Sequence, residues 1–187
     1  MKNKILFMTV AIITIVLSMS AQEKGTFTDS RDGKVYKTVK IGTQTWMAEN
    51  LAYNASGCWA YDNNQSNVAT YGYLYFWEVA QVACPNGWHL PTIEEYNILL
   101  ANYGGSGKTA YKALKDGGKS GFSALFGGSR SKNGTFYNMY STSFFWSSSG
   151  LDGSDAWYLD LGLFDKKEAN TFISSRNAGL SVRCVKD

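Results

Sequence analysis

The 187-residue sequence has one histidine, two prolines and three cysteines, and it contains no long block of basic residues. The single histidine, His89, excludes a metal centre built from several histidines and leaves one imidazole as a candidate base. The formal net charge is +3, but it includes two lysines at the extreme N-terminus. The rest of the chain is therefore nearly neutral, and we predict no nucleic-acid partner.

Long aliphatic runs are absent beyond residue 21, whereas glycine, serine, asparagine and aromatic residues are abundant. This composition is typical of a loop-rich extracellular domain with many Trp and Tyr rings in its core. It does not suit a helical bundle. Residues 22–187 have the length of one domain with a sizeable core, so we predict a single domain there.

The N-terminus has the pattern of a secretory signal peptide over residues 1–21. Lys2 and Lys4 precede an apolar run, 5–17, and the small residues of 18–21 suit signal peptidase. A membrane anchor is the alternative, but the run is shorter than the roughly 20 apolar residues that a spanning helix needs. We expect cleavage after Ala21, no membrane span in the remaining chain, and a secreted or cell-surface protein.

The order of predicted elements is strands, then helices, then strands, which indicates an α+β fold. The most distinct local pattern is at Thr92 and Glu95, which form a capping box before a helix that ends at Gly104. Shorter helices are predicted over 78–83 and 108–115, and a polar surface loop over 53–68. Strands are predicted over 26–28, 34–41, 122–125, 134–137, 143–148, 156–161 and 180–185.

The three cysteines, Cys58, Cys84 and Cys184, leave one thiol unpaired if a single disulfide forms. A bridge between Cys84 and Cys184 would close a loop of about 100 residues and restrict the unfolded chain by roughly 4–5 kcal/mol in the entropic model. Spacing alone also allows Cys58 to pair with either of the others.

Six motifs together resemble the Fibrobacter succinogenes major paralogous domain, a family of exported bacterial proteins. In order, they are TWMAENL at 45–51, YGYLYFW at 71–77, ACPNGWHLPT at 83–92, GFSA at 121–124, FWSS at 145–148 and LSVRC at 180–184. That family in turn is similar to the C-type lectin-like fold and to formylglycine-generating enzymes. The resemblance implies a C-type lectin-like fold with two main helices, short antiparallel sheets and a Cys84–Cys184 bridge. Members often carry a further cysteine about ten residues after Cys58, where this chain reads QSNVAT.

No catalytic constellation is predicted. Formylglycine-generating enzymes use two redox-active cysteines late in the domain, and this chain has only Cys184 there. A Ser–His–acid arrangement of His89 with Ser147 or Ser148 can be written down, but nothing in the sequence supports its geometry. We interpret His89 as a half-buried, hydrogen-bonding residue.

Aromatic residues outside the predicted core are the main binding candidates, because exposed rings stack on sugars and anchor protein interfaces. We assign Trp46, Trp77 and Trp88 to the core. The predicted binding residues are Trp59, Tyr61, Trp146 and Trp157, together with Asp152 and Asp155.

Asp152 and Asp155, with Asp160 nearby, are also the candidates for a calcium site. Their spacing matches no calcium loop, and a turn rich in Asp and Gly explains them better, so no cofactor is predicted. We expect an exported, non-catalytic module that binds a glycan or a surface protein through loops between Gly127 and Asp165. An enzyme on a formylglycine-generating-like scaffold and a purely structural surface protein are the alternatives.

Overall fold

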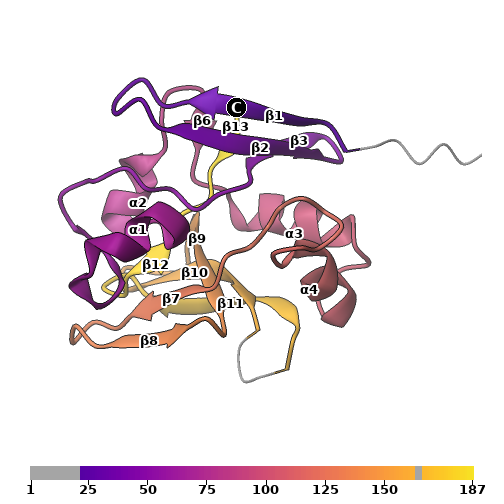
Figure 1. The fold of residues 1–187 in the computed structure, drawn as a ribbon. Helices are drawn as coiled ribbons and strands as arrows, with labels where there is room; N and C mark the ends of the chain where they lie inside the picture. Colours follow the sequence, from indigo (N-terminus) through magenta and orange to yellow (C-terminus); the bar gives the residue numbers. More distant parts are fainter. Residues whose placement is uncertain (1–21, 163–165) are drawn as a thin grey trace, which may run out of the picture.

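The computed structural model describes residues 22–162 and 166–187. The predicted signal peptide lies outside the described residues. The described chain is a mixed α+β structure of two sheets and four short α-helices. Figure 1 shows the smaller sheet at one end of the molecule.

The smaller sheet has the strand order β1-β2-β3-β13-β6. Its pairs are antiparallel, and in register Val39 lies opposite both Lys24 and Trp46. The N-terminal hairpin and the C-terminal strand therefore share one sheet. The bounds are β1 Lys24–Thr28, β2 Val35–Ile41, β3 Gln44–Met47, β6 Trp88–His89 and β13 Val185–Lys186.

The larger sheet runs β11-β10-β9-β12-β5-β4, and β7 joins it beside β9 and pairs with β8. Its bounds are β4 Cys58–Trp59, β5 Leu74–Tyr75, β7 Gly127–Arg130, β8 Phe136–Met139, β9 Ser143–Gly150, β10 Asp155–Leu161, β11 Ala169–Ser175 and β12 Leu180–Ser181. The last two strands of the chain are thus interior strands of different sheets. Strand β13 lies between β3 and β6, and β12 lies between β9 and β5.

Helices α2, α3 and α4 agree with the sequence pattern, whereas α1 was not predicted. The capping box of α3 is confirmed, since Thr92 Oγ1 accepts from Glu95 N at 3.1 Å and the Glu95 carboxylate accepts from Thr92 N at 2.8 Å. This helix packs against β9 and β10. The bounds are α1 Val68–Tyr71, α2 Trp77–Ala83, α3 Ile93–Ala101 and α4 Lys108–Leu114, with 3₁₀ turns at Tyr61–Asn63 and Gln65–Asn67. No helix of the described residues is long and apolar enough to cross a membrane.

Several predicted strands differ from the observed ones. The prediction over 122–125 is wrong, because this segment makes only one bridge, from Ala124 to Lys115, and is held mainly by a buried arginine described below. The strand predicted over 134–137 begins later, at Phe136. The strand predicted over 180–185 is two short strands in different sheets. Strands β4, β6, β7 and β11 were not predicted, and β4 lies within the predicted surface loop 53–68.

Buried side chains form two clusters, and the three tryptophans assigned to the core are buried. One cluster lies around Met47, Trp77 and Trp146, and the other around Trp46, Leu99 and Phe145. The indole Nε1 of Trp77 donates to Ser147 O, and that of Trp146 donates to Tyr75 O, both at 2.8 Å. Large rings with satisfied polar atoms therefore fill the interior of a loop-rich domain.

The disulfide joins Cys84 and Cys184 across 100 residues, as the family resemblance implies. It links the end of α2 to the residue directly before β13. Cys58 is free and half-buried, and burial raises the pKa of its thiol.

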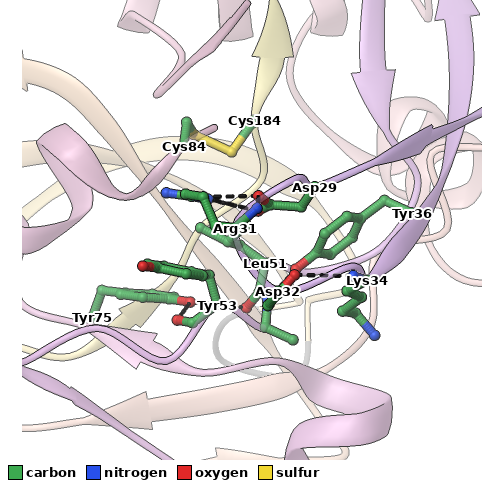
Figure 2. A network of polar contacts seen from close by, with 11 residues as sticks. Asp29, Arg31, Asp32, Lys34, Tyr36, Leu51, Tyr53, Tyr75, Cys84 and Cys184 are labelled. Carbon is green, nitrogen blue, oxygen red and sulfur yellow. Dashed lines mark hydrogen bonds and ion pairs between the residues drawn. A yellow bond between two sulfur atoms is a disulfide. The ribbon is translucent and has the colours of Figure 1, made fainter. Parts of the chain in front are cut away.

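Near this disulfide, the turn after β1 is fastened by Asp29 and Arg31 (Figure 2). The Arg31 guanidinium donates to both oxygens of the buried Asp29 carboxylate, from Nε to Oδ1 at 2.9 Å and from Nη2 to Oδ2 at 2.7 Å, and it lies 3.8 Å from the ring centroid of Tyr53. The hydrogen bond from Arg31 holds the pKa of Asp29 below its usual range. Tyr75 Oη donates to Tyr53 O at 2.7 Å, so the first hairpin is connected to the larger sheet.

Candidate functional site

Two adjacent cavities follow the segment between α4 and β7, and they share Asp116 and Leu125 in their walls. The first, of about 390 Å³, lies between this segment and the β1–β2 hairpin. The second, of about 180 Å³, lies against Tyr71 and Tyr140. We call the two together the groove, with a charged end and an aromatic end.

Arg183 fixes the segment that forms one wall of the groove. Its side chain is fully buried and donates hydrogen bonds to the backbone oxygens of Met47, Phe122 and Ser123 and to Asn50 Oδ1. Its guanidinium carbon also lies 4.6 Å from the ring centroid of Phe122. Hydrogen bonds from Arg183, rather than from a neighbouring strand, therefore hold the carbonyls of Phe122 and Ser123.

The buried guanidinium has no carboxylate within salt-bridge distance among residues 22–162 and 166–187. Desolvation lowers the pKa of Arg183 to about 9, and the charges of Glu49 and Asp116 act in the opposite direction. Arg183 is therefore still a cation at neutral pH. Both acids line the charged end of the groove.

The charged end carries two cations and two anions: Lys24 and Lys37 from the hairpin, Glu49 after β3, and Asp116 after α4. Glu49 Oε2 accepts a hydrogen bond from the backbone nitrogen of Lys37 at 2.7 Å. Within the described chain, the ammonium groups of Lys24 and Lys37 form no ion pair with either acid. Opposite charges thus face one cavity without neutralising one another.

The aromatic end is dominated by Tyr140, whose side chain is 70% exposed. Its backbone has a φ of 68°, which is unusual for a bulky residue, and its nitrogen donates to Phe126 O at 2.9 Å. The ring makes an edge contact with Tyr71, with centroids 5.8 Å apart. Strained backbone of this kind is concentrated at functional sites, so it marks Tyr140 as a candidate.

Trp59 and Tyr61, two predicted binding residues, both pack against side chains of the β7–β8 hairpin. The guanidinium of Arg130 lies 4.1 Å from the Trp59 ring centroid, and the rings of Tyr61 and Phe136 have centroids 5.1 Å apart. We call these four residues the Arg130 cluster. Trp59 and Tyr61 are half-buried, so part of each ring remains accessible.

Trp146 and Trp157 lie elsewhere. Trp146 has no exposed surface, so its ring cannot stack on a ligand and it leaves the set of binding candidates. Trp157 is half-buried on β10 opposite Ile173, which is exposed, and it lines neither cavity of the groove.

Asp152 and Asp155 organise the turn between β9 and β10. Asp152 Oδ1 accepts from Ser154 N at 2.7 Å and from Asp155 N at 2.8 Å, and these backbone hydrogen bonds lower the pKa of Asp152. Arg176 Nε donates to Asp155 O at 3.2 Å. Across the described residues, no group of three His, Cys, Asp or Glu side chains is arranged to hold a metal ion.

His89 is held between two carboxylates, with Nδ1 2.6 Å from Asp187 Oδ1 and Nε2 2.9 Å from Glu95 Oε1. Partial burial alone would lower the pKa of His89, but the hydrogen bonds to Asp187 and Glu95 outweigh it and raise the pKa. Ser147 is buried and its Oγ accepts from Ser149 N. Both imidazole nitrogens therefore face carboxylates, and a Ser–His–acid triad is not assembled.

The residues of the groove were not identified from the sequence. Its charged residues come from separate elements, and no motif links Lys24 to Asp116. Tyr140 follows β8 in a run of polar and aromatic residues that gives no distinctive pattern. The positive φ of Tyr140, which singles it out, is a property of the folded chain.

A family model described as the Fibrobacter succinogenes major domain matches residues 39–186. The match includes Glu49, Asp116, Tyr140 and Arg183, and it begins after Lys24 and Lys37. No curated protein and no solved structure matches the chain.

Proposed function

This chain belongs to the Fibrobacter succinogenes major domain family, and we propose that it is an exported, non-catalytic module that binds a glycan in the groove. It would act at the cell surface or in the extracellular space. The observation that carries the proposal is the exposed, strained Tyr140 at a cavity that shares Asp116 and Leu125 with a neighbouring charged cavity.

Sugar recognition combines an aromatic ring, which covers the apolar face of the sugar, with polar groups that bind its hydroxyls. The groove supplies both kinds of group at its two ends. The hydroxyl of Ser123 and the carboxylates of Glu49 and Asp116 are suitable partners for sugar hydroxyls.

A protein ligand is supported less well by these dimensions. Stable protein interfaces bury about 800 Å² on each partner and centre on aromatic anchors in dry pockets. The two cavities, of about 390 and 180 Å³, instead suit a short chain of small units. A protein partner would more readily use the Arg130 cluster and the neighbouring exposed Tyr137.

The enzymatic alternative has little support from the contacts of His89 and Ser147, because neither is arranged as a base beside a nucleophile. The only late cysteine, Cys184, is in the disulfide. A purely structural role leaves the exposure and backbone strain of Tyr140 unexplained.

We further propose that the scaffold is a variant of the C-type lectin-like fold. Support comes from the shared sheet of the N-terminal hairpin and β13, the helix α3 that follows the LPT phrase, and the disulfide before the last strand. Export is supported by the disulfide, which is typical of oxidising compartments, and by the signal-like N-terminus.

The proposal is tested with the full-length chain, exported by its own N-terminus, purified and applied to a glycan array with calcium or with EDTA. We expect binding to at least one glycan group and no dependence on calcium, because Asp152 Oδ1 is engaged in the β9–β10 turn. Tyr140→Ala should weaken binding by about tenfold, since one aromatic contact contributes roughly 1–1.5 kcal/mol.

Phe172→Ala is the matched control, because Phe172 is an exposed ring on β11 outside the groove. It should leave glycan binding unchanged. Thermal unfolding of each variant separates loss of binding from loss of structure. The proposal is overturned if no glycan is retained, or if Tyr140→Ala and Phe172→Ala bind equally well.

A further inference from the structure

The two lysines of the groove are placed to act together. Lys24 lies opposite Val39, and Lys37 is two residues before Val39, so both lysine side chains leave the same face of the β1–β2 hairpin. Such diagonal neighbours on antiparallel strands are about 7–8 Å apart, a spacing that allows two long side chains to converge on one group.

Neither ammonium group has a hydrogen-bond or ion-pair partner among the described residues. Two like charges on one face repel each other, and an anion between them removes that repulsion. The hairpin wall therefore offers an unfilled place for negative charge.

The two acids of the cavity do not fill this place, because Glu49 Oε2 is bonded to the backbone nitrogen of Lys37 and neither acid forms an ion pair with a lysine ammonium group among the described residues. Glu49 and Asp116 act on the buried Arg183, which has no carboxylate in contact with it. Two cations and two anions line the charged end, and the buried cation Arg183 behind its wall offsets part of the charge of the two acids, so the balance favours a ligand with a negative charge. Glu49 and Asp116 remain available as acceptors for neutral hydroxyl groups at the mouth of the cavity.

We infer that the glycan of the groove carries a carboxylate, as a uronic acid does, and that Lys24 and Lys37 bind this carboxylate while a neighbouring sugar ring stacks on Tyr140. This inference rests on the proposed function and names the class of ligand for the same site. Both lysines precede the span that the family model matches, so this preference belongs to the hairpin rather than to the matched domain.

The test uses an array of uronic-acid oligosaccharides in which each compound is paired with its carboxyl-reduced, neutral counterpart. We expect the carboxylated member of a pair to bind about five- to tenfold more tightly at low salt, with the difference shrinking as salt screens the contact. Lys24→Met/Lys37→Met should abolish this difference and keep the weaker binding of the neutral member.

Lys112→Met/Lys132→Met is the matched control, since it removes the same charge from two exposed lysines outside the groove. It should keep the full preference for carboxylated compounds. Equal, Tyr140-dependent binding of both members of every pair overturns the inference and leaves the proposed function standing. Absence of binding to any carbohydrate overturns both. A preference that survives the Lys24/Lys37 change also overturns the inference.

Discussion

The C-terminal segment, residues 180–186, and the rim of the groove use their side chains in opposite ways. In the segment, Arg183 and Cys184 are fully buried, and each is bonded to distant parts of the chain. At the rim, Lys24, Lys37 and Tyr140 are exposed. The comparison suggests a division of work in which the segment holds the fold and the rim contacts the ligand. Changes in the segment should therefore alter stability, and changes at the rim should alter binding.

Among changes to the segment and the rim, removal of the disulfide should have the largest effect on the free energy of unfolding. Cys84→Ala/Cys184→Ala should reduce the free energy of unfolding by about 4–5 kcal/mol, because the cross-link closes a loop of about 100 residues. Urea unfolding measures the change, and Cys58→Ala is the control, with an expected loss of less than about 1 kcal/mol. A small loss in the double variant would show that the segment is held by its strands and by Arg183 alone.

Arg183→Met should destabilise the protein by about 3–5 kcal/mol, since it leaves the carbonyls of Met47, Phe122 and Ser123 and the Asn50 amide oxygen without the Arg183 donor. Urea unfolding again gives the value. Lys37→Met serves as the control cation and should change the free energy of unfolding by less than about 0.5 kcal/mol. Similar losses for the two variants would contradict the division between segment and rim.

The smallest effect concerns Tyr140→Gly, which should raise the free energy of unfolding by about 0.5–1 kcal/mol while weakening glycan binding. Glycine adopts a positive φ without strain, which stabilises the folded protein. We expect this stabilisation to exceed the loss that comes from the greater conformational freedom of glycine in the unfolded chain. Asn138→Gly, at a φ of 63° in the preceding strand β8, is the control and should gain less, because asparagine already tolerates this conformation. A loss of stability in Tyr140→Gly would mean that packing of its ring against Tyr71 outweighs the strain.

The elements that the sequence predicts well depend on neighbours in the chain. Helix α3 follows from Thr92 and Glu95, three residues apart, and β10 has consecutive apolar and aromatic residues. Strand β7 was missed because Gly127 and Gly128 have little strand propensity. Its Gly128 has a φ of 66° and lies close to the ring of Tyr61, where a side chain would not fit.

The groove was missed for a related reason, since its parts meet only in the folded chain. The 122–125 segment has the residues of a strand, but Arg183, about 60 residues later, binds its carbonyls instead. Trp146 and Trp157 both lie in predicted strands flanked by glycine and serine, yet Trp146 is in the core and Trp157 is half-buried. Local composition does not distinguish them, because burial depends on which strands come to lie on each side.

The interior position of β12 and β13 also has a consequence for when the protein can fold. A chain is synthesised from its N-terminus, so β3 and β6, like β9 and β5, are complete before the strand that separates them exists. Neither sheet can close, and the disulfide cannot form, until the last described residues have been made. An exported chain would therefore remain loosely structured while it is threaded through a narrow translocation channel, and would become compact only after its final strand had arrived on the far side.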